Sequence, residues 1–346
     1  MNVEIKKWSD VDGDDWSSLL VGNGGSIAID SRFGYPSLHE VARKLDLLKE
    51  NGRAVFDQYG STNFEFILET LSHALRVEKA LALDPSKVAA THDEVQRALI
   101  ETVKATHCGP EQVRGHLGPL TRFLRRFETV VTFNYDLTLY WAMIEANATV
   151  LNCNWFKDGF VDKGSFVTWW PALRKRHHPA TGSTLVFFGH GSLVLGRDLS
   201  GNEVKIHAKE RTPGWDTDLL NTIAGAWTTG GYSPLFISEG ESASKRRAIQ
   251  GSRYLSVVHD QVMSDLGDGV VTYGFGFAEN DAHVLAAMRS RTRLPKRIAI
   301  GVYTGQPTEE QQAFCHRAIA AIKEQLGAGV GIVFFDHASP GCWINP

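Results

Sequence analysis

Short, unbroken apolar runs recur along this chain and constrain its fold more than any other feature. They are rich in Val, Ile, Leu and Phe, and they do not alternate with polar residues. Strands with this pattern are typically buried on both faces, as in parallel sheets. The runs are Ser18–Val21, Thr129–Phe133, Thr149–Leu151, Thr184–Phe188, Leu235–Ile237, Gly269–Thr272, Arg297–Tyr303 and Gly331–Phe335.

Longer stretches with apolar residues at helical spacing separate these runs. They are Leu38–Glu50, Asn63–Ala82, His92–Lys104 and Glu111–Arg126. Alternation of strands and helices predicts an α/β protein with a Rossmann-like, doubly wound, mostly parallel sheet. We expect one domain over residues 1–346, with a helical insertion at about 36–127.

Two further segments, at about 152–183 and 196–233, have no clear periodicity and are expected to be irregular, the second with one short helix. The first contains the Trp-rich stretch Trp155–Trp170. That stretch is a candidate lid or contact surface, and packed core is an equal alternative.

Charge and apolar content exclude several classes of protein. The formal net charge is -3, so no overall basic field attracts nucleic acid or an anionic membrane. No apolar run reaches the roughly 20 residues that span a bilayer, and the first residues lack the apolar core of a signal peptide. We therefore expect a cytoplasmic protein with no direct nucleic-acid or membrane partner.

The four cysteines, Cys108, Cys153, Cys315 and Cys342, are scattered and form no CxxC pair. This spacing disfavours a disulfide framework and a cysteine-rich zinc site. The sequence predicts reduced, mostly structural thiols.

Four of the apolar runs end in small clusters of Gly, Asn, Asp, Ser or His. Ligands of open parallel sheets bind outside the carboxyl ends of the strands. Because the strand order is not readable from sequence, convergence of these ends on one pocket is an expectation. The clusters are Gly22–Ser26, Asn134–Asp136, Gly189–Ser192 and Tyr273–Gly276.

The cluster Gly22–Ser26 is suited to a tight turn in which phosphate oxygens approach backbone N–H groups. A glycine-rich turn without a ligand is an equal alternative. The cluster is not the GxGxxG fingerprint of dehydrogenases, because residue 27 is Ile. No second strand ends in an acidic residue at the required distance either, so hydride transfer is disfavoured.

Asn134 and Asp136 follow a predicted strand and suit a ribose, since the amide donates and accepts while the carboxylate accepts from hydroxyls. The alternative for Asp136 is a cap of the predicted helix Leu137–Ala146. His190 lies between Gly189 and Gly191, which leave its imidazole uncovered. His190 is therefore a candidate catalytic residue, with a structural role as an equal alternative, whereas the other twelve histidines are interpreted as surface or packing residues.

With these motifs in order, the chain resembles the sirtuin-like superfamily. Sirtuins carry GAGxS, TQNxD, an HG pair, PxxxxFGE and GTS. The counterparts here are Gly22–Ser26, Thr132–Asp136, His190-Gly191, Pro234 through Glu241, and Tyr273–Gly276. The chain lacks the four-cysteine zinc module of sirtuin deacylases, and its motifs read TFN and GFG rather than TQN and GTS.

Asn134-Tyr-Asp136 and the stretch from Gly274 to His283 look more like bacterial sirtuin-like effector domains, which commonly consume NAD in anti-phage defence. The chain also resembles a stand-alone bacterial family of this type over nearly its full length. The resemblance implies an NAD glycohydrolase that takes NAD as its substrate, needs no metal, and is regulated by self-association, a partner protein or a nucleotide signal.

The same resemblance assigns roles to residues. Asn134, Asp136 and His190 would be catalytic, with Asn134 on the nicotinamide ribose and His190 as general base. The predicted cofactor-binding residues are Gly22, Asn23, Gly24, Ser26, Gly191, Gly274, Gly276 and Asp281. Two alternatives remain: a non-catalytic NAD or ADP-ribose sensor or complex subunit, and an NAD-dependent deacylase, which the missing zinc module disfavours.

Overall fold

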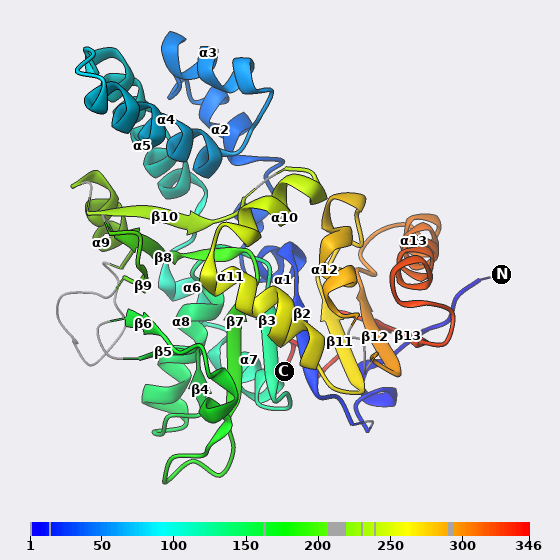
Figure 1. Ribbon diagram of the computed structural model, residues 1–346. Coiled ribbons are helices and arrows are strands. Elements are labelled where there is room, and N and C mark those ends of the chain that lie inside the picture. The colour runs from blue at the N-terminus through cyan, green and yellow to red at the C-terminus, as the bar shows by residue number, and fades with distance from the viewer. Residues whose placement is uncertain are drawn as a thin grey trace.

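The computed structural model describes residues 2–13, 15–161, 164–198, 200–206, 219–229, 231–238, 240–289 and 294–346. Its main feature is an eight-stranded sheet in the order β1-β13-β12-β11-β2-β3-β7-β4 (Figure 1). Every neighbouring pair in this sheet is parallel. The strands are β1 (Ile5–Lys6), β2 (Ser18–Val21), β3 (Thr129–Thr132), β4 (Phe156–Lys157), β7 (Thr184–Phe188), β11 (Gly269–Tyr273), β12 (Arg297–Val302) and β13 (Gly331–Asp336).

The order of the six longer strands is that of a dinucleotide-binding Rossmann sheet. Without the two-residue edge strands β1 and β4, the sheet reads β7-β3-β2-β11-β12-β13, which is 3-2-1-4-5-6 in chain order. The order reverses between β2 and β11, so the topological switch point lies there. Helices pack on both faces of the sheet (Figure 1). The predicted Rossmann-like, doubly wound architecture is confirmed.

Continuous apolar runs form strands here because both faces of the sheet are covered. Each residue of β2, β3, β7 and β11 is buried. The predicted strand Thr149–Leu151 is wrong, because its first residues belong to a π-helical segment, Ala146–Val150, that continues α8 (Thr138–Glu145). Thr149 favours a strand locally, but its hydroxyl donates to Glu145 O at 2.9 Å, which satisfies it within the helix.

The predicted helical insertion is present and divides into two parts. Helices α2–α5 form a lobe at one side of the sheet, at the top of Figure 1, and the apolar stripe of α4 is buried in it. The next two helices, α6 and α7, pack against α8 in the main body. The bounds are α2 (Leu38–Lys44), α3 (Glu50–Tyr59), α4 (Phe64–Ala80), α5 (Ser86–Thr106), α6 (Pro110–Arg114) and α7 (Leu117–Leu124).

A second, antiparallel sheet has the order β10-β8-β9-β6-β5. Two expectations were wrong. Segments that were expected to be irregular contribute strands to this sheet, and Leu235–Ile237 contributes to it rather than to the parallel sheet. Its strands are short or contain glycine and charged residues, which hides them from a pattern search. They are β5 (Phe160–Val161), β6 (Ser165–Phe166), β8 (Gly191–Asp198), β9 (Glu203–Lys205) and β10 (Tyr232–Phe236).

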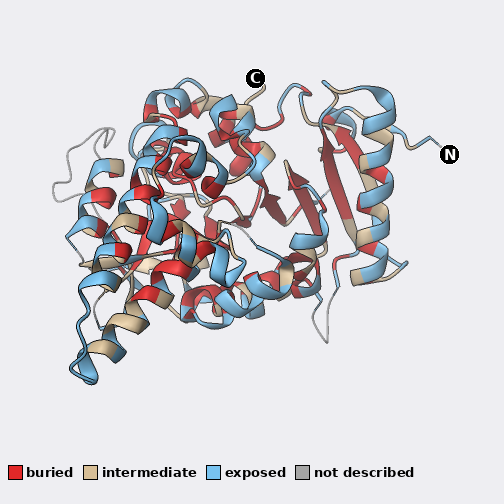
Figure 2. Ribbon diagram, turned by 90° about the horizontal axis from the view of Figure 1, so that it is seen from above, coloured by how far each residue is buried: buried red, intermediate tan, exposed pale blue. Residues whose placement is uncertain are grey.

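The expected short helix of the second irregular segment is α9 (Leu219–Thr228), while residues 207–218 of that segment lie outside the described residues. Buried residues concentrate in the strands and on the inner sides of the helices (Figure 2). The remaining helices are α1 (Asn23–Ile29), α10 (Ser242–Gln250), α11 (Arg253–Val257), α12 (Ala282–Ala287) and α13 (Thr308–Leu326).

The Trp-rich stretch packs against β7 through Trp155 and Trp170. The Trp155 indole donates to Thr184 Oγ1 at 3.1 Å, at the first residue of β7, and the buried Trp170 ring contacts Phe187. These contacts favour packed core for Trp155 and Trp170, whereas Trp169 is 72% exposed. Within the described residues, no helix is long and apolar enough to cross a membrane.

Candidate functional site

The four strands with polar ends lie side by side in the sheet. β11, β2, β3 and β7 are consecutive, and the register pairs Val21 with Tyr273 and Thr132, and Thr132 with Phe188. Because these strands are parallel, their carboxyl ends meet at one edge, across the switch point. The expected convergence of the polar loops is confirmed at the level of the strands.

The loops after β2 and β11 pack against each other through glycines. The Gly24 N–H donates to Gly274 O at 2.9 Å, and a Cβ on Gly22 would lie 2.5 Å from the same oxygen. Gly274 has φ +64°, and a Cβ there would lie 2.3 Å from the Gly25 nitrogen. These glycines therefore let two backbones approach closely, and the Gly24 amide already has a protein acceptor.

Asn134, Ser26 and Asp136 form a buried hydrogen-bonded chain, named here the amide cluster. Asn134 Nδ2 donates to Gly22 O at 3.0 Å and to Ser26 Oγ at 2.8 Å. Ser26 Oγ donates to Asp136 Oδ2 at 2.5 Å. The Thr138 N–H and hydroxyl donate to Asp136 Oδ1 at 2.8 and 2.5 Å.

These contacts separate the roles within the amide cluster. Both carboxylate oxygens of Asp136 are occupied, one of them by the N–H of the first residue of α8. The N-cap of α8 is Leu137, so Asp136 is not the expected N-cap but forms an Asx-type turn that leads into the helix. Ser26 is fully engaged inside the cluster. The amide oxygen of Asn134 is the group that this cluster has to offer to a ligand hydroxyl.

His107, a buried histidine outside the predicted site, contacts the backbone next to Asp136 of the amide cluster. The Leu137 N–H donates to His107 Nε2 at 2.9 Å, which places the ring proton on Nδ1, 2.8 Å from Cys108 O. Burial lowers the pKa of His107, and the nearby Asp136 carboxylate acts in the opposite direction. A neutral His107 thus fixes the backbone beside Asp136.

His190 makes its closest polar contact with a second histidine. His190 Nε2 lies 2.8 Å from His283 Nε2 of α12, and the two rings are inclined by 19°. Ser242 Oγ of α10 accepts from the backbone N–H of His283 at 3.1 Å and lies 3.3 Å from the ring nitrogen Nδ1 of His283. Ser242 therefore holds His283 in place.

Burial sets the charge state of this histidine pair. Burial is the main cause that lowers the pKa of His190 well below its usual value, and Lys245 adds to the effect. The same two causes lower the pKa of His283 to about 4. Both imidazoles are therefore neutral near pH 7.

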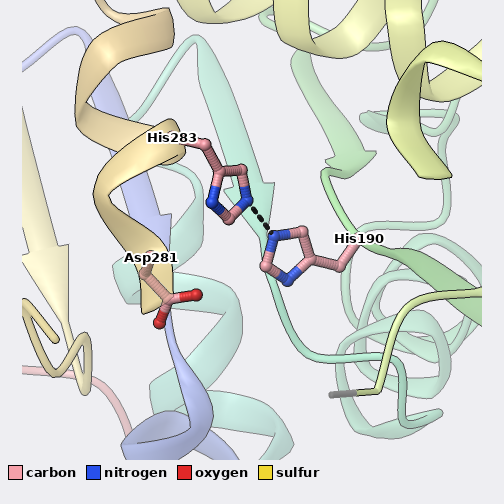
Figure 3. Close-up of side chains that lie close together, drawn as sticks. All are labelled: His190, Asp281 and His283. Atoms are coloured by element: carbon pink, nitrogen blue, oxygen red, sulfur yellow. Dashed lines mark hydrogen bonds between the residues drawn. The ribbon is translucent and has the colours of Figure 1, made fainter. Parts of the chain in front are cut away.

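Asp281, predicted to bind the cofactor, lies beside this pair (Figure 3). Its Oδ1 accepts from Lys245 Nζ of α10 at 2.7 Å. The Lys245 side chain is only 7% exposed, so this is a largely buried ion pair. Together, His190, Asp281 and His283 are named here the two-histidine cluster.

The amide cluster and the two-histidine cluster adjoin at Phe133. The centroids of the Phe133 and His190 rings lie 5.0 Å apart. Gly189 makes room for the Phe133 ring, because a Cβ on this glycine would lie 2.5 Å from it. Among the described residues, no hydrogen bond links Asn134 to His190. Asn134 is 9% exposed and His190 is 3% exposed, so this arrangement is closed, and a ligand needs side-chain or loop movement to enter.

The other predicted cofactor-binding residues have structural or surface positions. The exposed Asn23 donates through its amide to Phe33 O at 3.2 Å. Gly191 has φ +75°, and a Cβ there would lie 2.2 Å from Leu235 O, so this glycine permits the pairing of β8 with β10. Gly276 is exposed, and its Cβ would meet nothing within 4 Å.

Sequence reasoning missed Ser242, Lys245, His283 and His107. His283 lies in a short helix of ordinary composition, without the flanking glycines that single out His190. Ser242 and Lys245 lie on a different helix, which only the tertiary fold brings to α12. One weak signal existed, because the stretch resembling bacterial effector domains ends at His283.

The fold and these clusters define the class of protein: a Rossmann-like α/β protein with polar side chains gathered at the switch point of its parallel sheet. The chain belongs to the family DUF4917, described as a domain of unknown function, whose model matches residues 19–343. No curated protein matches the sequence.

Proposed function

We propose that this protein is an NAD glycohydrolase, which cleaves NAD to nicotinamide and ADP-ribose. The proposal rests on one observation above all: Asn134 and His190 follow neighbouring parallel strands at the same register, beside the switch point of a sheet with the dinucleotide-binding order. Dinucleotides bind at this place in open α/β sheets. The sequence resemblance to sirtuin-like NAD-consuming enzymes supports the same substrate.

The reaction needs few groups. Water attacks C1′ of the nicotinamide ribose, the C–N bond breaks with its electron pair going to nicotinamide, and the water proton goes to a base. Nicotinamide is already a cationic leaving group in NAD, so no strong general acid is required. Orientation and polar groups stabilise the oxocarbenium character of the transition state.

In this proposal the neutral imidazole of His190 accepts the proton from water or from a ribose hydroxyl. The amide oxygen of Asn134 accepts from a hydroxyl of the nicotinamide ribose. Asp136 acts indirectly, because its oxygens hold Ser26 and the start of α8, and Ser26 in turn orients the Asn134 amide.

The closed site supports a regulated enzyme, since Asn134 and His190 are both nearly inaccessible to solvent. An NAD hydrolase without control would drain its own cell. We propose that self-association, a partner protein or a nucleotide signal opens the site. By resemblance to bacterial sirtuin-like effectors, we assign the protein to cytoplasmic anti-phage defence.

Product analysis over a protein concentration series tests the proposal. The purified chain is incubated with NAD, and nicotinamide and ADP-ribose are separated by chromatography. We expect nicotinamide release that rises more steeply than the protein concentration. His190→Ala and Asn134→Ala should each reduce the rate by about 10²-fold or more. His337→Gln should retain it, because His337 contacts Tyr273 and Tyr303 rather than a member of either cluster.

The other outcomes decide between the alternatives. Saturable NAD binding without release at any concentration would favour a sensor. Release that requires an acyl-lysine peptide would favour a deacylase. Absence of both binding and release would overturn the proposal.

A further inference from the structure

The two-histidine cluster has the composition of a metal site. His190 comes from the turn between β7 and β8, and Asp281 and His283 come from the start of α12 (Figure 3). One nitrogen from each histidine and one carboxylate oxygen lie within 4.8 Å of one another. Both histidines are buried, and Asp281 is half-buried, so the three side chains are held by their surroundings rather than mobile at the surface.

The hydrogen bonds around the two rings leave a lone pair on each Nε2. Ser242 Oγ accepts from the His283 N–H and lies 3.3 Å from His283 Nδ1, which fits an Nδ1–H donor. For His190, the Phe133 backbone favours an Nδ1–H donor, because Nε2 faces His283. Partners of this kind on the second ring nitrogen orient histidines that bind metals.

Two lone pairs that face each other at 2.8 Å repel unless a proton or a cation lies between them. We propose that the two-histidine cluster binds a divalent transition-metal ion, with His190 Nε2, His283 Nε2 and an Asp281 oxygen as ligands. A tetrahedral ion with metal–nitrogen distances of about 2.0–2.1 Å needs the two nitrogens about 3.3 Å apart, so a shift of a few tenths of an ångström accommodates it.

The ligand set selects the ion. Two imidazoles and one carboxylate suit Zn²⁺, Co²⁺ or Ni²⁺, whereas Mg²⁺ and Ca²⁺ prefer oxygen ligands alone. Three protein ligands leave one tetrahedral position for water or another small ligand.

Lys245 limits the affinity of this site. Its ammonium group holds Asp281 Oδ1 at 2.7 Å, which leaves Oδ2 for the ion and orients the carboxylate. The same positive charge repels a cation, and its side chain is only 7% exposed, so solvent screens it weakly. Removing this charge should therefore strengthen metal binding, while removing a ligand should weaken it.

Metal occupancy also has a consequence that rests on the proposed function. The Nε2 lone pair of His190 is the one that accepts the proton in NAD cleavage, and it cannot bind a metal ion and a proton together. The bound ion thus withdraws the base, so occupancy by Zn²⁺ switches off nicotinamide release. The site would act as an inhibitory metal site for NAD cleavage.

Cobalt titration of the metal-free, full-length chain tests the site without any need for activity. Co²⁺ bound to nitrogen and oxygen ligands is followed by its visible absorption, and Zn²⁺ is added as a competitor. We expect saturable binding of one ion. His283→Gln and Asp281→Asn should each weaken it by about 10-fold or more, Lys245→Met should tighten it by about 10-fold, and His337→Gln should leave it unchanged.

Lys245→Met guards against misfolding as an explanation, because a damaged fold does not bind a metal more tightly. Absence of saturable cobalt binding, or binding that His283→Gln leaves unchanged, overturns the site. Nicotinamide release with and without Zn²⁺ is measured separately. Cobalt binding without NAD cleavage under any condition would leave the site standing and remove the proposed function. Cleavage without cobalt binding would do the reverse.

Discussion

Gly274→Ala should destabilise the protein far more than the neighbouring Gly276→Ala. Gly274 has a positive φ of +64°, and its added Cβ would lie 2.3 Å from the Gly25 nitrogen and 2.5 Å from the Gly24 carbonyl carbon. Both contacts are with backbone, so no side chain can move aside to relieve them. The loops after β2 and β11 must then separate.

The magnitude follows from three contributions. A left-handed backbone conformation costs a non-glycine residue about 1–2 kcal/mol, and overpacking typically costs about 1–3 kcal/mol. Restriction of the unfolded chain returns about 0.4–1 kcal/mol. We therefore expect the free energy of unfolding to fall by about 1–5 kcal/mol. A Cβ on Gly276 meets nothing within 4 Å, so that variant should lie within about 0.5 kcal/mol of the wild type.

Urea denaturation followed by circular dichroism measures both variants, with linear extrapolation to water. The comparison is matched, since the two glycines lie two residues apart in one loop and receive the same substitution. Equal stability of the two variants would show that the loops after β2 and β11 do not pack as described. The reasoning about the switch point would then be refuted.

Two further predictions concern the amide cluster and its support. Asp136→Asn should lower the free energy of unfolding by about 1–3 kcal/mol, because the carboxylate accepts charge-assisted hydrogen bonds from Ser26 and Thr138. In a double-mutant cycle, the effects of Asp136→Asn and Ser26→Ala on this free energy should be non-additive. Strict additivity would contradict the contact between the two side chains. Burial lowers the pKa of His107 below 6.5. Below about pH 6.5 the unfolded chain therefore binds a proton on this residue that the folded chain does not bind. The contribution of His107 to the free energy of unfolding then falls with decreasing pH, by at most ~1.4 kcal/mol per pH unit. His107→Gln should reduce that slope in urea titrations at pH 7.5 and 5.5 (roughly either side of the unfolded-state value), whereas an unchanged slope would show that His107 is not buried and neutral.

The strands of the central sheet could be predicted because their apolar runs are unbroken. Ser18–Val21 and Thr184–Phe188 were delimited to the residue, since burial on both faces removes the need for alternation. The second sheet was missed for the opposite reason. β9 has three residues, and β8 ends in Gly196, Arg197 and Asp198, so tertiary pairing rather than local pattern makes them strands.

The candidate site was predictable where it lies on one strand end, and not where it is assembled from remote segments. Asn134 and His190 stand out in sequence because Asn134 directly follows an apolar run and His190 follows one after Gly189. The sequence contains no sign that the Asn134 amide would donate to Ser26 or that His190 would face His283. Both contacts depend on the strand order and on the packing of α12, which are features of the tertiary fold and cannot be read from local sequence.

The position of NAD bound to the His190→Ala variant tests the central claim most directly. A crystal structure of that complex should show the dinucleotide across the carboxyl ends of β2, β3, β7 and β11, with a nicotinamide-ribose hydroxyl at hydrogen-bonding distance from the Asn134 amide oxygen. NAD bound at any other part of the surface, or with its nicotinamide ribose turned away from Asn134, would contradict the account.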